Sequence, residues 1–258
     1  MIHPLVYELN TRCWLRELSD ESGGHITLAN VPDGQFERWQ RFGFTHIWLM
    51  GVWTTGPRSC AVARSVEGLR REYAAHWPDH EMIDLAGSPY SIAEYRVSAE
   101  LGGEAGLKEF RQKLHARGMK LILDFVPNHL GLDHRWLIER PDLLVQGPAD
   151  APGTFAQETQ GGPRWLAHGK DPYFPPWTDT AQLDYRLRAT HDAMRELLLE
   201  ISGQCDGVRC DMAMLILKDV FAGTWKHFSP KGDVAVVEFW AEAIEAVRQR
   251  HPDFLSLA

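Results

Sequence analysis

The chain has 258 residues, of which 44% are hydrophobic and 24% are charged. These proportions are typical of a globular chain that can bury a core, and they exclude an intrinsically disordered protein. Acidic residues outnumber basic residues by 35 to 27, which gives a formal net charge of -8. This balance argues against nucleic acid or an anionic membrane as the main partner, and it is compatible with a neutral ligand such as a sugar.

The cysteines and the apolar runs indicate the cellular setting that we expect. The four cysteines, Cys13, Cys60, Cys205 and Cys210, include no Cys-x-x-Cys pair, so we expect buried free thiols in a reducing compartment. No apolar run approaches the roughly 18 residues of a membrane helix. The N-terminus also lacks a basic region followed by an apolar stretch, so we expect a cytoplasmic protein without a membrane partner.

Apolar runs and segments of helical period alternate along the chain. Strands are expected over residues 5–10, 45–50, 120–126, 206–211 and the opening of a fifth strand over 254–258. Helices are expected over residues 32–42, 62–76, 103–117, 187–201 and 234–250. In the first helix Phe36 and Trp39 share one face, and Gly118 suits a left-handed cap after the third.

The segment from about residue 130 to 180 has a different character. It is rich in glycine, proline and aromatic residues and shows no helical period. So long an irregular segment inside a compact domain is usually functional.

The alternation of strands and helices, without hairpin signals, predicts a parallel α/β sheet. No glycine fingerprint follows the first strand, which disfavours a dinucleotide-binding fold. A (β/α)8 barrel fits better, and in such barrels the active site lies at the carboxyl ends of the strands. Because a closed barrel needs eight strands, four strands and the start of a fifth predict a partial barrel and a truncated chain.

Two motifs place polar residues where apolar strands end. The first is Asp124-Phe125-Val126-Pro127-Asn128-His129, although Asp and Asn before a loop often only cap the turn. The second is Gly207-Val208-Arg209-Cys210-Asp211. Residues two apart in a strand share a face, so Arg209 and Asp211 project together, as a glycosidase nucleophile and its partner or as a structural ion pair.

Together, these motifs resemble the first and second signature regions of glycoside hydrolase family 13, the α-amylase family. They occur in the same order, at the ends of the third and fourth strands. Gly87-Ser88-Pro89-Tyr90 with Tyr95 resembles the family's segment after strand two, and Ala181-Gln182-Leu183-Asp184 resembles the motif that closes its domain B.

The resemblance implies an α/β fold with strands 1–4 and the start of strand 5 of a TIM barrel, and an irregular domain B inserted after strand 3. The implied divisions are 1–129, 130–183 and 184–258. The implied function is a retaining α-glycosidase that acts on oligosaccharide or polysaccharide α-glucans or on α-glucosides.

The resemblance also implies a role for each matching residue. Asp211 would be the nucleophile that forms a β-glycosyl intermediate, and Arg209 would orient it. Asp124 and His129 would bind sugar hydroxyls, and Tyr90 would stack on the sugar ring.

The chain departs from the family in its acids. The family's acid/base glutamate would lie immediately beyond Ala258, and its third carboxylate is also absent. Glu238 and Glu242 lie in a helical pattern and are expected on its solvated face. We therefore expect the 258 residues alone to have little or no activity.

A second departure concerns calcium. Asn128 often ligates a structural calcium in relatives, but Met214 and Leu215 replace the Lys-His that follows the nucleophile in many amylases. Calcium needs several oxygen ligands, so the site is unsupported and no cofactor is expected to be required.

Two other functions are compatible with these motifs. One is a transglycosidase of the same family that handles sucrose, trehalose or maltose. The other is a non-catalytic binding module, which the retention of Asp211, Arg209, Asp124 and His129 disfavours.

Overall fold

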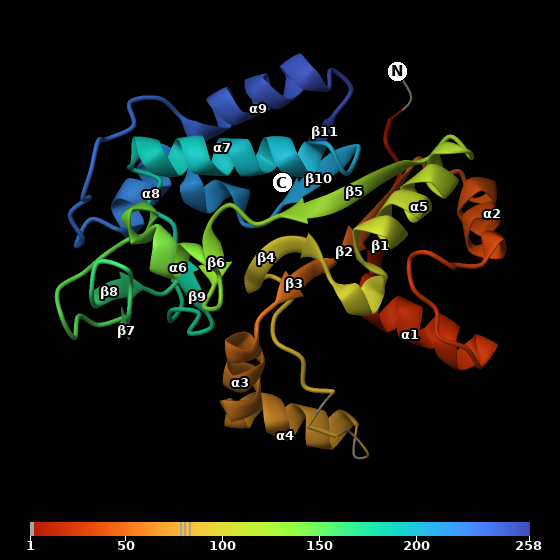
Figure 1. Ribbon diagram of the computed structural model, residues 1–258, viewed down its shortest axis with the longest axis horizontal. Helices are drawn as coiled ribbons and strands as arrows, with labels where there is room; N and C mark the ends of the chain where they lie inside the picture. Colours follow the sequence, from red (N-terminus) through yellow and green to blue (C-terminus); the bar gives the residue numbers. More distant parts are fainter. Residues whose placement is uncertain (1–2, 78, 80, 83) are drawn as a thin grey trace.

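The computed structural model describes residues 3–77, 79, 81–82 and 84–258. Its centre is a parallel sheet of five strands, arranged in space in the same order as in the chain (Figure 1). The strands are β1 (Val6–Asn10), β2 (His46–Met50), β5 (Lys120–Phe125), β10 (Gly207–Cys210) and β11 (Leu255–Leu257). The expected partial barrel is confirmed in this order, because each strand pairs with the next strand of the sheet.

Helices connect consecutive strands of this sheet, and α7 and α9 lie side by side over it (Figure 1). The connecting helices are α1 (Thr11–Ser22) and α2 (Asp33–Arg41) after β1, α5 (Gly103–His115) after β2, α7 (Arg188–Ser202) after β5, and α8 (Lys218–Thr224) and α9 (Phe239–Arg250) after β10. Short turns of helix complete the chain: α6 (Trp136–Glu139), η1 (Ala99–Leu101), η2 (Pro141–Leu143) and η3 (Ala213–Ile216).

The three central strands β2, β5 and β10 bury one face completely and leave the other partly open. Alternate residues of a strand point to opposite faces. Those that join the core beneath the helices have no exposed surface: Ile47, Leu49, Leu121, Leu123 and Val208. Their neighbours Trp48, Met50 and Arg209 are only half-buried. The open face therefore carries the polar and aromatic groups that later define the site.

The expectation of a chain without hairpins is wrong outside the central sheet. Three antiparallel pairs form there: β3 (Trp53–Thr55) with β4 (Ile92–Val97), β6 (His129–Gly131) with β9 (Thr180–Gln182), and β7 (Thr154–Gln157) with β8 (Arg164–Ala167). The last pair is a hairpin, whose turn includes Gly162 at a φ of 87°. Apart from β4, which has six residues, these strands have three or four residues and are too short for an alternating pattern to predict them.

Two expected helices have different bounds. Residues 62–76 fall in two helices, α3 (Pro57–Ser65) and α4 (Glu67–His76), because Val66 between them is extended (φ −75°, ψ 106°). The helix expected from residue 234 begins at Phe239. Ala235 instead donates its backbone N–H to the Arg186 carbonyl (2.8 Å), which holds this stretch against the segment before α7.

The helix α1 was not expected. The Asn10 side chain caps its first turn by accepting a hydrogen bond from the Cys13 backbone N–H (3.3 Å). All four cysteines are free, but only Cys205 and Cys210 are buried, whereas Cys13 is exposed. Within the described residues, no helix is both long enough and apolar enough to cross a lipid bilayer.

Candidate active site

The carboxyl ends of β5 and β10 bring the predicted polar residues together. The strand register places Arg209 directly opposite Asp124. One step further, the Asp211 backbone N–H donates to the Phe125 carbonyl at 2.8 Å. Both carboxylates therefore lie at the same edge of the sheet, as the barrel prediction requires.

Arg209 and Asp211 form a close ion pair on the open face. Nη1 of Arg209 lies 2.5 Å from Oδ1 of Asp211, and Asp211 is only 7% exposed. Burial alone would lower the pKa of Arg209, but the adjacent Asp211 carboxylate raises it above its ordinary value. The guanidinium thus stays charged and holds the Asp211 carboxylate in one orientation.

Two aromatic rings flank the guanidinium of Arg209. Its Cζ lies 5.3 Å from the ring centroid of Trp48 and 5.4 Å from that of Tyr90. Such contacts favour a cation over the ring face. Burial, with a contribution from the Asp124 charge, raises the pKa of Tyr90 to about 12, so its hydroxyl stays neutral.

Asp124 is 1% exposed and is held by two donors from the β2 side. The Trp48 indole N–H donates to Oδ1 (3.1 Å) and the Gly51 backbone N–H donates to Oδ2 (2.8 Å). Burial raises the pKa of Asp124 to about 7, although both hydrogen bonds and Arg209 oppose this shift. The carboxyl therefore stays protonated to a higher pH than an ordinary aspartate does.

His129 is the first residue of β6 and lies near the carboxyl ends of β5 and β10. Burial lowers its pKa below the ordinary value, and the negative charges of Asp211 and Asp179 only partly offset this effect. Its ring packs against the Trp177 ring in an edge-to-face geometry, with 5.3 Å between the ring centroids. A neutral imidazole in this position can donate one hydrogen bond and accept another.

Sequence reasoning missed Trp48 and Gly51. The two-residue period of β2 places Trp48 on the open face, but only the register of β2 against β5 shows that it reaches Asp124. Gly51 adopts a left-handed φ of 77°, and a Cβ there would lie 2.9 Å from the Pro89 Cβ. The turn that aims its N–H at Asp124 therefore requires glycine.

The backbone turns sharply directly after Asp211. Met212 has φ 50° and ψ 37°, a left-handed conformation that is unusual for a residue other than glycine. Strain of this kind is found at functional sites, where the surrounding structure enforces it.

The surroundings of Asn128 do not fit a calcium ion. Gln182 Nε2 donates to the Asn128 side-chain Oδ1 (3.1 Å) and to its backbone oxygen (2.7 Å), so both oxygens already have a partner. Among the described residues, no three or more His, Cys, Asp or Glu side chains gather to hold a metal ion.

Glu238 and Glu242 are engaged elsewhere. Both oxygens of Glu242 accept from Arg188 Nη1 (2.9 and 2.8 Å), so its expected place on a solvated face is wrong: it is half-buried between α7 and α9. Glu238 accepts from the Lys218 backbone N–H (3.1 Å). The partners of both carboxylates, Arg188 and Lys218, lie on helices α7 and α8 rather than at the strand ends.

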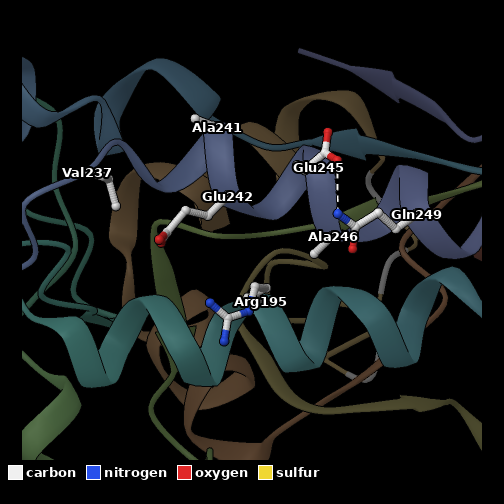
Figure 2. Close-up of a pocket in the computed structure, with 7 residues that line it drawn as sticks. All are labelled: Arg195, Val237, Ala241, Glu242, Glu245, Ala246 and Gln249. Carbon is white, nitrogen blue, oxygen red and sulfur yellow. Dashed lines mark hydrogen bonds between the residues drawn. The ribbon is translucent and has the colours of Figure 1, made fainter.

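Glu242 also borders a groove of the outer helical layer. Figure 2 shows Glu242 and Arg195 facing each other across this groove, which has a volume of about 430 Å³. It lies between α7 and α9 and has a lining rich in alanine, and its described lining residues include none of those at the strand ends.

A parallel sheet with a buried Asp and an Arg–Asp pair at the carboxyl ends of its strands is the arrangement expected of a barrel enzyme. The family model for the α-amylase catalytic domain matches residues 36–258. The chain belongs to this family, glycoside hydrolase family 13.

Several curated proteins are similar in sequence. The α-amylase MalA of Haloarcula japonica is 27% identical over 179 residues, which cover 67% of this chain and 22% of that protein. The 4-α-glucanotransferase of Thermotoga maritima is 27% identical over 170 residues, 60% of this chain and 38% of that protein. An oligo-1,6-glucosidase of Parageobacillus thermoglucosidasius is 41% identical over 51 residues, 19% of this chain and 9% of that protein.

Solved structures share the fold. An α-amylase from Lactobacillus plantarum superposes with a TM-score of 0.61 at 21% identity, over 98% of this chain and 44% of that one. The trehalose-6-phosphate hydrolase of Bacillus licheniformis gives a TM-score of 0.59 at 18% identity, over 98% of this chain and 43% of that one. The chain therefore spans less than half the length of these relatives.

Proposed function

We propose that the chain supplies the nucleophile side of a retaining α-glycosidase that acts on α-glucans or α-glucosides. The observation that carries the proposal is the Arg209–Asp211 pair at the end of β10, next to the buried Asp124. The names of the relatives, an amylase, a glucosidase and a glucanotransferase, also support an enzyme that acts on α-glucans or α-glucosides.

In the proposed reaction the Asp211 carboxylate attacks the anomeric carbon, and the bond from that carbon to the leaving oxygen breaks. The Arg209 guanidinium holds the attacking carboxylate in one orientation. Asp124 and His129 would hydrogen-bond the hydroxyls of the sugar, and Tyr90 would lie against its ring. Water then attacks the glycosyl ester, which releases the sugar with its original anomeric configuration.

The first step also needs an acid that protonates the leaving oxygen, held about 5–5.5 Å from the nucleophile in retaining enzymes. Among the described residues, Glu238 and Glu242 are committed to other partners. We therefore propose that residues 1–258 alone have little or no turnover. A polypeptide that also includes the later strands of the barrel should be active, and equal turnover by the two would contradict this part of the proposal.

The direct test compares Asp211→Asn with wild type in the natural polypeptide that contains these residues. With maltooligosaccharides or an aryl α-glucoside as substrate, we expect the loss of the nucleophile to reduce kcat by at least about 10³-fold. Asp192→Asn, on the exposed side of α7, is the matched control and should retain activity. Proton NMR of the wild-type reaction should show the α-anomer first. An Asp211→Asn enzyme with wild-type turnover would refute the proposal.

Transfer to a sugar acceptor is the second candidate, because one relative is named a 4-α-glucanotransferase. In that reaction an acceptor hydroxyl replaces water in the second step. Adding free glucose to the assay distinguishes the two reactions. Lengthened oligosaccharides indicate transfer, whereas unchanged products indicate hydrolysis.

We also propose that residues 130–183 form the family's domain B. This segment contains β7, β8 and most of the β6–β9 pair. Because β6 begins at His129, the segment would position one wall of the sugar site.

A further inference from the structure

An exposed aromatic pair lies in the loop between β8 and β9. Tyr173 is 87% exposed and Phe174 is 70% exposed. Adjacent aromatic residues with this much exposed surface are unusual, and exposed apolar groups gathered in one place often mark a binding surface. We call residues 170–176 the aromatic loop.

The tip of the aromatic loop has a fixed conformation. The Asp171 side-chain Oδ1 accepts hydrogen bonds from the backbone N–H groups of Tyr173 (2.6 Å) and Phe174 (2.9 Å). The tip is flanked by Pro172 and Pro175, whose φ angles are restricted. A loop preorganised in this way loses little conformational entropy when a ligand binds.

Both ends of the aromatic loop lie against His129. The Trp177 backbone N–H donates to the Gly169 carbonyl (2.8 Å) and closes the loop at its base. The Trp177 ring packs on His129 (5.3 Å), and a Cβ at Gly169 would lie 3.1 Å from the His129 Cβ. The loop thus starts and ends at a residue of the candidate site.

The chemistry of the tip fits a neutral sugar ring. Asp171 is occupied by the backbone of the tip, and Lys170 lies over the Trp225 ring, 5.0 Å from its centroid, so neither charge lies free beside the two rings. Aromatic rings bind the apolar C–H face of a pyranose and tolerate its equatorial hydroxyls. Tyr173 is four residues from both Gly169 and Trp177, which limits its distance from the base to about 14 Å.

We propose that Tyr173 and Phe174 form a platform for a glucosyl ring of the substrate, beyond the ring that is held at Asp211. The inference rests on the proposed function, and it adds a preference for oligosaccharides that are long enough to reach the platform.

The test is calorimetric binding of maltose and of maltoheptaose to the natural polypeptide, in an Asp211→Asn background that prevents turnover. We expect Tyr173→Ala with Phe174→Ala to weaken maltoheptaose binding about tenfold, because one stacked ring contact is lost. Maltose binding should not change. Circular dichroism and the melting temperature check that the variant folds.

Two controls separate the platform from a general effect. The exchange Tyr173→Phe with Phe174→Tyr keeps both rings and should keep binding. Phe42→Ala removes another exposed ring (57%). Phe42 precedes the amino end of β2, whereas the candidate site lies at the carboxyl ends of the strands, so this change should not affect maltoheptaose binding. Unchanged maltoheptaose binding by the double alanine variant would overturn the inference alone. If the parent protein bound neither sugar, the proposed function would fail, and the platform with it.

Discussion

Trp48 connects two residues of the candidate site. Its indole N–H donates to the Asp124 carboxyl, and its ring face covers the Arg209 guanidinium. One side chain thus positions both the buried acid and the cation that holds Asp211. We expect it to act as a positioning residue, through these two neighbours.

Trp48→Phe should separate the two contacts, because phenylalanine keeps a ring near Arg209 but has no N–H. The lost hydrogen bond lowers the pKa of Asp124 in the wild type, so the variant should titrate Asp124 at a higher pH. Carbon-13 NMR of the aspartate carboxyl groups measures this directly. Stability should fall by only about 1 kcal/mol.

Trp53→Phe is the matched control for this titration. The Trp53 indole also donates to Asp124, but to its backbone carbonyl (2.8 Å) rather than to its carboxyl. The Asp124 titration should therefore stay at its wild-type pH. Equal shifts in the two variants would show that Trp48 acts only through general packing.

Asp124 should also make stability depend on pH. Its pKa is raised from 3.8 to about 7 in the folded chain, so the folded state binds this proton more tightly than the unfolded state does. The stabilisation is complete below about pH 4 and is lost as the pH rises through about 7, by an amount on the order of a few kcal/mol.

Asp124→Asn removes this titration. Urea unfolding at pH 5 and pH 8 should show that the wild type loses more stability over this interval than the variant. The difference between the two pH values is the relevant quantity, because the amide also changes the bonds from Trp48 and Gly51. Parallel losses in both proteins would show that Asp124 is ionised throughout.

At the scale of elements, β6 depends on a glycine. A Cβ on Gly131 would lie 2.6 Å from the Ser91 carbonyl oxygen and 2.9 Å from the Ile92 carbonyl carbon. These are backbone atoms, which cannot move aside as a flexible side chain does. Because β6 also carries His129, the separation of β6 from β4 should disturb the site.

Gly131→Ala should therefore lower the free energy of unfolding by about 1–3 kcal/mol and weaken sugar binding. Gly34→Ala in α2 is the control, since a Cβ there meets nothing within 4 Å. It should be neutral or stabilising by up to about 1 kcal/mol. Chemical denaturation of the three proteins compares them, and a Gly131→Ala protein as stable as wild type would contradict the close approach of the strands.

The strands and helices of the sheet could be predicted because their apolar residues recur with a clear period. The Phe36–Trp39 face, for example, is buried as the pattern indicates. The break at Val66 and the late start of α9 could not be predicted, because an extended backbone angle and a hydrogen bond to Arg186 decide them. The local pattern of apolar residues contains no information about this backbone angle or this hydrogen bond.

The same limit applies to the site. Two strand-end motifs suffice to bring Asp124, His129, Arg209 and Asp211 to one edge. The pairing of Asn128 with Gln182, 54 positions later, and the bond from Trp48, 76 positions from Asp124, depend on register and on chain crossings. The roles of these four residues, Asp124, His129, Arg209 and Asp211, in binding and catalysis stay predictions.

At the scale of the whole molecule, the Asn128–Gln182 pair predicts that stability does not depend on calcium. Both oxygens of Asn128 accept hydrogen bonds within the protein, so we expect that a chelator removes no calcium ion from this position. The melting temperature of residues 1–258 should be the same in EDTA and in excess calcium. A rise of several degrees with calcium would mean that the ion displaces Gln182 and binds this junction.

The proposed nucleophile, Asp211 at the end of β10, can be tested directly by covalent trapping. A 5-fluoro glycosyl fluoride, incubated with the natural polypeptide that contains these residues, should trap the glycosyl ester formed in the first step. Peptide mass spectrometry should find the label on Asp211, and Asp211→Asn should remain unlabelled. A covalent label on Asp124 or on any other residue would contradict the assignment.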